Sequence, residues 1–197
     1  DAYPLAPMQQ GMVFHSLLDE HAGVDIIQLS CLLEGEVRAD LFRRAWQEVV
    51  DRHGALRTAY LAADGGDPVQ VVIDRVVLPW EDLDWRAVPA GEQAERLSTW
   101  IRDDRHRGFT IDRPPLMRCA LIQRGAGRAQ FIWSHHHLLT DGWCLPILLN
   151  EAMVIYQGLV DAQPVALPEP RPFADYLRWL SRQDHHAGAS FWKANLA

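Results

Sequence analysis

Apolar residues recur at helical spacing in three long stretches of the chain. From Ala39 to His53 the charged residues lie opposite a single apolar stripe, made of Leu41, Phe42, Ala45, Trp46, Val49 and Val50. This pattern predicts an amphipathic helix that ends before Gly54. A second helix is predicted over 90–107, with Ala94, Leu97 and Ile101 inward and its charges on a solvated face. A third is predicted after Gly142, to end at Gly158, with the stripe Leu145, Leu148, Leu149, Ala152 and Tyr156.

The N-terminal stretch from Tyr3 to Leu18 has a shorter helical pattern. Pro7 suits a first helical turn, and an apolar stripe is predicted at Met8, Met12, His15 and Leu18. We expect both methionines to fill the core, because flexible thioether side chains suit irregular gaps.

Several shorter runs are rich in apolar and β-branched residues and predict strands. They cover 25–34, 55–61, 69–73, 116–123 and 130–133, with turns at 64–68 and 124–128. The stretch 78–86 is expected to be a loop whose tryptophans cover the core. Helices and strands alternate without strict βαβ order, which predicts an α/β fold with a mixed, mainly antiparallel sheet packed against helices.

Four prolines between Gln163 and Pro172 predict an extended connection, followed by short helices near 173–181 and 189–196. We therefore expect residues 1–163 to form the core of the fold and residues 164–197 to form a connection leading onward. Because the chain begins with Asp1, we expect it to belong to a longer protein.

Composition narrows the class of protein. The 197 residues are 48% hydrophobic, enough for a packed core, and the net charge of −7 gives no support for nucleic-acid binding. Three scattered cysteines indicate neither a disulfide framework nor a zinc site, and no apolar run approaches about 20 residues. We expect a cytoplasmic protein that does not enter the membrane.

The densest candidate chemistry lies in FIWSHHHLLTDGW, residues 131–143. Histidines that follow a buried strand stand where loops commonly carry function, and a neutral imidazole can act as a general base near pH 7. Alternation along a strand places His135 and His137 on one side and His136 on the other. Asp141 could fix the following loop by an ion pair or by accepting backbone N–H bonds, and Gly142 could let a ligand approach the backbone.

Other interpretations of these histidines are less specific. Adjacent strand residues diverge, and no HExxH or CxxC spacing supplies further ligands for a metal. His135 or His136 taken alone is more simply explained as a core residue.

Residues 136–142 resemble the HHxxxDG motif of condensation domains from nonribosomal peptide synthetases, and chloramphenicol acetyltransferases have a related HxxxD motif. The resemblance implies a chloramphenicol-acetyltransferase-like lobe. It makes His137 the catalytic histidine, His136 a supporting one and Asp141 a structural acid beside Gly142. His135 lies outside the motif.

Two further stretches carry the same resemblance. YPLAPMQQGM, residues 3–12, is similar to the family's first motif, and RHGALRT, residues 52–58, is similar to its second, RHxxLRT. The family pattern pairs Arg57 with the motif aspartate, so a buried Arg57–Asp141 ion pair is expected, in which the guanidinium would satisfy the carboxylate.

The resemblance implies that an acceptor aminoacyl amine attacks a donor thioester and forms an amide. No bound cofactor is expected, since the phosphopantetheine arm arrives on donor and acceptor peptidyl carrier proteins. The chain matches about the first half of such a domain, so we expect a C-terminal lobe and an adjacent adenylation domain as partners, and an isolated lobe that is inactive.

Related functions remain open at this point. An epimerization domain also has HHxxxDG and would use the histidine for proton exchange at Cα, although its first motif usually differs from residues 3–12. A heterocyclization domain would need a DxxxxD pattern, which the sequence lacks. A non-catalytic recruitment module normally has a broken motif, and this motif is intact.

Overall fold

Two β-sheets organise the computed structural model, which describes residues 1–18, 25–61, 67–125 and 127–196. The larger sheet has the strand order β2–β7–β6–β5, and its strands are β2 (Ile26–Glu34), β7 (Arg128–His136), β6 (Met117–Gly125) and β5 (Trp80–Asp84). β5 runs parallel to β6, and the other neighbours are antiparallel. The predicted mixed, mainly antiparallel sheet is confirmed.

The predicted loop over 78–86 is wrong, because β5 occupies its centre. Its side chains are half-buried or exposed, so the strand lacks the apolar and β-branched residues that predict the other strands. Backbone pairing with β6, from Trp80 opposite Cys119 to Asp84 opposite Gln123, holds it at the sheet edge.

The smaller sheet has the order β1–β4–β3, with β1 (Ala2–Pro4), β4 (Val69–Val72) and β3 (Thr58–Leu61), all antiparallel. Residues expected to begin the β3 strand form instead the 3-10 turn η1 (Gly54–Arg57). The predicted turn at 64–68 falls largely outside the described residues.

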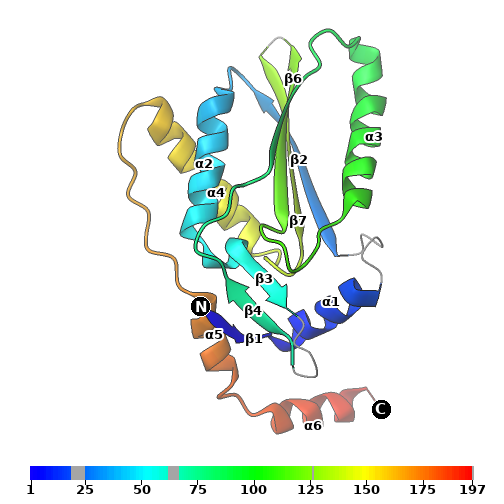
Figure 1. The fold of residues 1–197 in the computed structure, drawn as a ribbon, viewed down its shortest axis with the longest axis vertical. Coiled ribbons are helices and arrows are strands. Elements are labelled where there is room, and N and C mark those ends of the chain that lie inside the picture. The colour runs from blue at the N-terminus through cyan, green and yellow to red at the C-terminus, as the bar shows by residue number, and fades with distance from the viewer. Residues whose placement is uncertain (19–24, 62–66, 126, 197) are drawn as a thin grey trace.

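Helices cover both faces of the larger sheet (Figure 1). α2 (Ala39–Arg52) and α4 (Cys144–Val160) lie against one face, and α3 (Ala90–Arg107) covers the other. The stripe predicted on α2 is confirmed except at Leu41, which is only half-buried.

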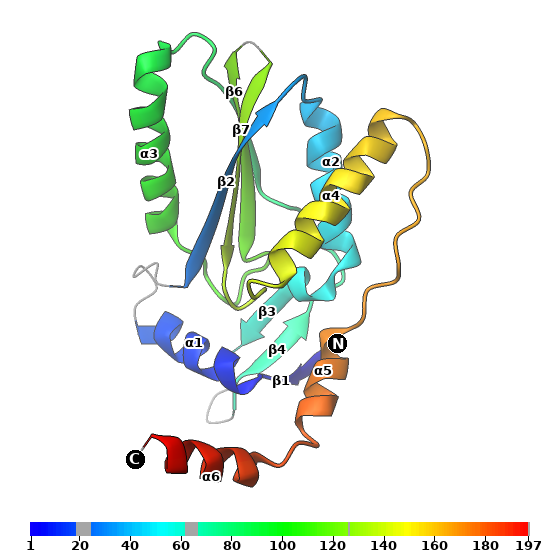
Figure 2. The ribbon, with the colours of Figure 1, turned by 180° about the vertical axis from the view of Figure 1, so that it is seen from behind.

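β7 lies in the middle of this arrangement, between β2 and β6 (Figure 2). Phe131 and Trp133 join the core under α2, where both contact Trp46, while Ile132 packs in the cluster under α3. Burial on both faces explains why residues 131–133 form an uninterrupted apolar run and do not alternate with polar residues.

Of the three residues predicted to face inward on α3, Leu97 and Ile101 pack against the cluster that contains Ile132, whereas Ala94 is exposed. The helix also buries two polar side chains, Gln93 and Asp104. Asp104 accepts hydrogen bonds from Arg118 and Ser134 of the sheet. A buried carboxylate keeps its charge only with such partners, and the Arg118 and Ser134 bonds hold the pKa of Asp104 below its usual value against the opposing effect of burial.

The stripe predicted on α1 (Pro7–Leu18) is wrong. Met8 and Leu18 are 74% and 70% exposed, and the buried side chains are Gln9 and Val13. Met12 packs partly against the core, so it alone of the two methionines fills it. The helix buries the polar Gln9 beside Val13, and hydrophobic spacing cannot reveal the hydrogen-bond partners of that glutamine.

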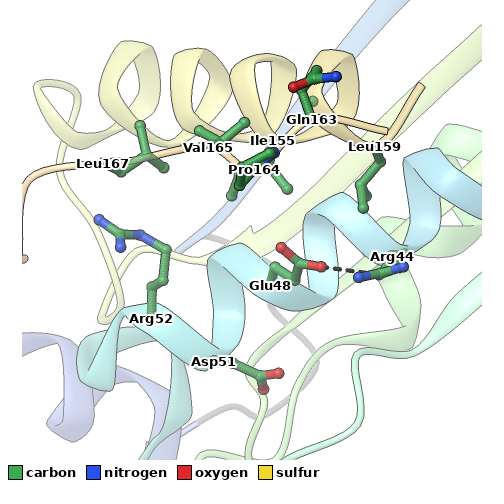
Figure 3. Close-up of a pocket in the computed structure, with 11 residues that line it drawn as sticks. Arg44, Glu48, Asp51, Arg52, Ile155, Leu159, Gln163, Pro164, Val165 and Leu167 are labelled. Atoms are coloured by element: carbon green, nitrogen blue, oxygen red, sulfur yellow. Dashed lines mark hydrogen bonds and ion pairs between the residues drawn. The ribbon is translucent and has the colours of Figure 1, made fainter. Parts of the chain in front are cut away.

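The Pro-rich stretch is extended, as expected, and leads to α5 (Phe173–Leu180) and α6 (His185–Asn195). Its first part lies along α4 and borders an open groove of about 590 Å³ between α4 and α2 (Figure 3). Gly158 does not end α4, which continues to Val160. A Cβ at position 158 would meet Val165 Cγ2 at 2.2 Å, so only a residue without a side chain lets the extended connection pack this closely against α4. No helix of the described ranges has the length and apolar character needed to cross a membrane.

Replacing Gly158 by alanine should therefore destabilise the protein. The new methyl group would collide with Val165 and with the carbonyl oxygen of Gln163 at 3.0 Å, at a cost of about 1 to 3 kcal/mol in the free energy of unfolding. Gly11→Ala in α1 is the matched control, because a Cβ there meets nothing within 4 Å, and it should stabilise by roughly 0.5 to 1 kcal/mol. Urea unfolding of both variants measures the difference. Equal effects at the two positions would contradict the packing of the connection on α4.

Candidate active site

The three histidines occupy the end of β7 and the first position beyond it. His135 and His136 still pair with β2, opposite Ile27 and Ile26, and His137 begins the turn that leads to α4. The backbone N–H of His137 donates to the Asp25 carbonyl at 2.7 Å. Alternation along the strand therefore applies through His136, and the His137 side chain is directed by the turn.

His135 is a core residue. Its side chain is 1% exposed and stacks on Trp133 with ring centroids 4.5 Å apart. Burial first, and then the neighbouring imidazoles of His137 and His136, lower the pKa of His135 to about 4. The ring is neutral at pH 7 and lies too deep in the core to face a substrate.

His136 has a fixed tautomer. The Leu138 N–H donates to its Nδ1 at 3.1 Å, so that nitrogen carries no hydrogen. Burial lowers the pKa of His136 to about 4, against the opposing effect of Asp25, and the neutral ring therefore bears its hydrogen on Nε2. Nε2 lies 3.2 Å from Ser16 Oγ and donates to it, and Ser16 donates onward to the Met12 carbonyl at 2.9 Å. His136 thus joins α1 to the turn.

His137 has the opposite tautomer. Its Nδ1 lies 2.7 Å from the Thr140 carbonyl oxygen, which can only accept a hydrogen bond, so Nδ1 bears the hydrogen. The neutral ring keeps its lone pair on Nε2. Unlike His135 and His136, which are buried, His137 is half-buried. This is the arrangement needed to accept a proton or to hold an N–H group.

Asp141 caps the N-terminus of α4. Its Oδ1 accepts the backbone N–H groups of Trp143 at 3.0 Å and Cys144 at 3.1 Å. Hydrogen bonds from the Cys144 thiol, and then from these amides, lower the pKa of this exposed carboxyl. Because the carboxylate occupies the positive end of α4, that helix end does not remain open to stabilise an anion.

The expected Arg57–Asp141 ion pair is wrong for this structure. Arg57 donates to the backbone carbonyls of Val50, Ile73 and Asp74, and Asp141 is exposed at the start of α4. The η1 turn directs the guanidinium between α2 and the end of β4, where the Val50 carbonyl on one side and the Ile73 and Asp74 carbonyls on the other satisfy it. Arg57 therefore braces α2 against β4 and does not neutralise the motif aspartate.

Gly142 is exposed, and a Cβ there would meet no atom within 4 Å. Packing within the described residues does not require glycine, so its predicted approach to a ligand stays a prediction.

Ser16, whose hydroxyl accepts a hydrogen bond from His136, is not among the residues predicted from the sequence. A serine within a predicted helix has no neighbouring pattern that would mark it as part of a site. Within the described ranges, no three or more His, Cys, Asp or Glu side chains are grouped to hold a metal ion.

The groove of Figure 3 lies apart from these residues. It contains none of the predicted site residues and borders the second half of α4, at Ile155 and Leu159. Ile155 is eleven positions after Cys144 in α4, which is about 16 Å along the helix.

The buried histidines should make the protein sensitive to acid. Unfolded histidine takes up a proton near pH 6.5, whereas folded His135 and His136 do so near pH 4, so protons bind preferentially to the unfolded chain between these values. The stability that each neutral ring contributes should be complete above pH 6.5. It should be lost as the pH falls from 6.5 to 4, which lowers the free energy of unfolding by up to about 3 kcal/mol for each ring.

His135→Phe preserves a ring on Trp133 and should remove roughly half of this loss. His106→Gln, at an exposed position of α3, is the control and should leave the loss intact. Urea titrations at pH 4.5, 5.5 and 7 provide the measurement. A His135→Phe protein with the full acid sensitivity would show that this ring is not the buried neutral group described.

A double-mutant cycle distinguishes capping from ion pairing at Asp141. Asp141→Ala should cost about 1 kcal/mol, and Asp141→Asn much less because asparagine also caps helices. Combining Asp141→Ala with Arg57→Ala should be additive within about 0.5 kcal/mol, since the two side chains share no partner. A coupling of several kcal/mol, as expected for a buried ion pair, would refute the capping role.

The amino-acid sequence is similar to proteins of one known family. Residues 1–197 match the Condensation domain family. A linear gramicidin synthase protein from Brevibacillus parabrevis is 42% identical over 193 residues, which is 98% of this chain and 4% of that protein. Tyrocidine synthase 2 from the same organism is 35% identical over 98% of this chain and 5% of its own length. Bacitracin synthase 1 from Bacillus licheniformis is 34% identical over 97% of this chain and 4% of its own length.

Solved structures show the same fold. The starter condensation domain of rhizomide synthetase superposes with a TM-score of 0.83 at 20% identity, covering 92% of this chain and 45% of that chain. The first condensation domain of the calcium-dependent antibiotic synthetase gives a TM-score of 0.76 at 20% identity, covering 85% and 41%. The chain spans less than half of these solved chains and a few per cent of the curated relatives.

Fold and site together define an α/β lobe of the chloramphenicol-acetyltransferase-like class, with a histidine motif at the end of a central strand. Within that class, the chain belongs to the condensation-domain family, as the match over its whole length shows.

Proposed function

We propose that this chain forms one wall of a condensation site that makes amide bonds in nonribosomal peptide synthesis. The amine of a carrier-bound aminoacyl acceptor attacks the thioester carbonyl of a carrier-bound donor. A C–N bond forms, the C–S bond breaks, the donor carrier's phosphopantetheine thiol leaves, and the amine loses one proton. The observation that supports this most is the His137 tautomer, which leaves the lone pair on Nε2 of a half-buried residue.

His137 is the residue placed to accept that proton or to hold the amine. Its Nδ1–H bond to the Thr140 carbonyl oxygen holds the ring and leaves Nε2 as the nitrogen that can accept a hydrogen. Alignment of two tethered reactants supplies much of such a rate enhancement, so a strong base is unnecessary. His136 acts through the turn, Asp141 holds the start of α4, and Gly142 leaves space beside the reacting groups.

The other components of the reaction are proposed from the family. Donor and acceptor peptidyl carrier proteins deliver the phosphopantetheine arms as substrates, a C-terminal lobe supplies the facing wall, and an adenylation domain lies nearby in the same synthetase. Residues 1–163 form the N-terminal lobe in this proposal, and residues 164–197 lead to the C-terminal lobe.

Replacing His137 by alanine in the full-length protein should reduce amide formation by about a hundredfold or more, because the proton acceptor is lost. His135→Phe is the matched control and should retain most of the activity, since that ring lies in the core. The assay mixes donor- and acceptor-loaded carrier proteins, and mass spectrometry with chiral analysis follows the product. Amide formation unaffected by His137→Ala would refute the assignment, and inversion at Cα without amide formation would indicate epimerization instead.

The isolated chain should fold without catalysing condensation. Its core is continuous around α2, α4 and the central sheet, so thermal unfolding is expected to be cooperative. Without a second wall the two thioesters lose the alignment that is worth several kcal/mol. Amide product at a rate near that of the full-length protein would show that residues 1–197 align both substrates on their own.

A further inference from the structure

The residue after His137 is held at both of its backbone polar groups. The Leu138 N–H donates to His136 Nδ1, and the Leu138 carbonyl oxygen accepts the Tyr60 hydroxyl at 2.7 Å. Leu138 itself is 4% exposed, so neither group can exchange its partner for solvent. The main chain beside His137 is therefore fixed on its carbonyl side by a side chain distant in the sequence.

Tyr60 belongs to the small sheet, on β3, and is 2% exposed. Burial, with a smaller contribution from Tyr3, raises the pKa of its hydroxyl, which therefore stays protonated and remains a donor. Its backbone N–H is bonded to the Ile111 carbonyl at 2.9 Å, which limits movement of the residue. A short bond from a buried, immobile donor gives Leu138 a defined position.

Two buried glutamines support this contact. Gln9 Nε2 lies 3.2 Å from the Tyr60 hydroxyl oxygen and 3.3 Å from the Leu138 carbonyl oxygen. Gln9 Oε1 accepts from Gln70 Nε2 at 2.9 Å, and Gln70 also donates to the Pro4 carbonyl. All three side chains are at most 8% exposed, and each comes from a different element: α1, β3 or β4. Burying an amide side chain costs free energy unless its hydrogen-bonding groups have partners. The hydrogen bonds within this cluster therefore explain why these polar residues are buried.

We propose that Tyr60 is a positioning residue for His137, with Gln9 as its support, and that the small sheet serves to carry this contact. Tyr60 does not touch the substrate in this proposal. It holds the Leu138 carbonyl, and through the short turn from His137 to Thr140 it sets the direction of the imidazole. The inference rests on the proposed condensation activity.

Tyr60→Phe removes the hydroxyl and keeps the ring. In the full-length protein it should lower kcat for amide formation by roughly ten- to hundredfold, because a small displacement of the reacting group is costly. The KM values for both loaded carrier proteins should change less than about twofold, because Tyr60 does not contact the substrates and its loss leaves their binding unchanged. Gln9→Met removes the longer contacts to the Tyr60 hydroxyl and the Leu138 carbonyl, together with the bond from Gln70, but keeps the short Tyr60–Leu138 bond, so it should give a smaller loss of kcat.

Tyr156→Phe is the matched control. The Tyr156 hydroxyl accepts the backbone N–H of Arg38 at 3.0 Å, on the outer side of the fold, so this variant also loses one hydroxyl bond. In the isolated chain both Tyr→Phe variants should remain folded, and the larger loss of melting temperature, about 2 to 4 °C, is expected for Tyr60→Phe because its hydroxyl bond is buried. Only Tyr60→Phe should lower kcat.

Unchanged kcat in Tyr60→Phe would overturn the proposal, as would equal kcat losses in the two tyrosine variants or a larger loss in Gln9→Met. If Tyr60→Phe does not fold, the test rests on Gln9→Met. A kcat equal to that of the wild type in Gln9→Met would then overturn the proposed positioning role. His137→Ala in the same assay separates the two levels: if it abolishes turnover while Tyr60→Phe does not lower it, only the positioning role fails. If His137→Ala is fully active, the proposed function fails first.

Discussion

The hydrogen bond from the Leu138 amide to His136 Nδ1 determines much of what surrounds it. Because it removes the hydrogen from Nδ1, the neutral ring must carry its hydrogen on Nε2, and only an acceptor on that side can satisfy the ring. Ser16 of α1 is that acceptor. One buried imidazole thus fixes the turn that begins at His137 and the helix that packs beneath it.

The two sheets have different parts in this arrangement. The larger sheet brings β7 to a defined end, with both faces buried and its pairing with β2 continuing to His136. Asp25, just before β2, then takes the His137 N–H. The smaller sheet is held against the same turn from below (Figure 1). A strand alone could not hold an imidazole beyond its last residue, since loop backbone without partners is free to move.

The sequence allowed prediction of the elements whose burial is apolar. The stripe from Phe42 to Val50 leaves a helical period in the sequence, and the buried strand β7 leaves a short apolar run, so each pattern predicts its element. α1 violated this rule because Gln9 is buried for its hydrogen bonds while Met8 is exposed. β5 was missed because an edge strand is held by its backbone, on which side-chain spacing carries little information.

Within the candidate site, spacing located His137 and Asp141 but not their partners. A carboxylate before a helix can pair with an arginine or cap the helix, and both outcomes are compatible with the letters of the motif. The turn geometry at Arg57 decided between them. Tautomers likewise depend on which atoms meet across the fold, and for His136 those atoms come from residues 120 positions apart.

Long-range proton–nitrogen correlation spectra of the histidine rings, recorded on the isotope-labelled chain at pH 7, test the arrangement most directly. They report which ring nitrogen bears the hydrogen. His136 should be protonated on Nε2, and His137 should be protonated on Nδ1 in its neutral form. Changes of temperature or salt concentration should not alter either assignment. A neutral His137 with its hydrogen on Nε2, or a His136 with its hydrogen on Nδ1, would contradict the account of how this turn prepares its histidine.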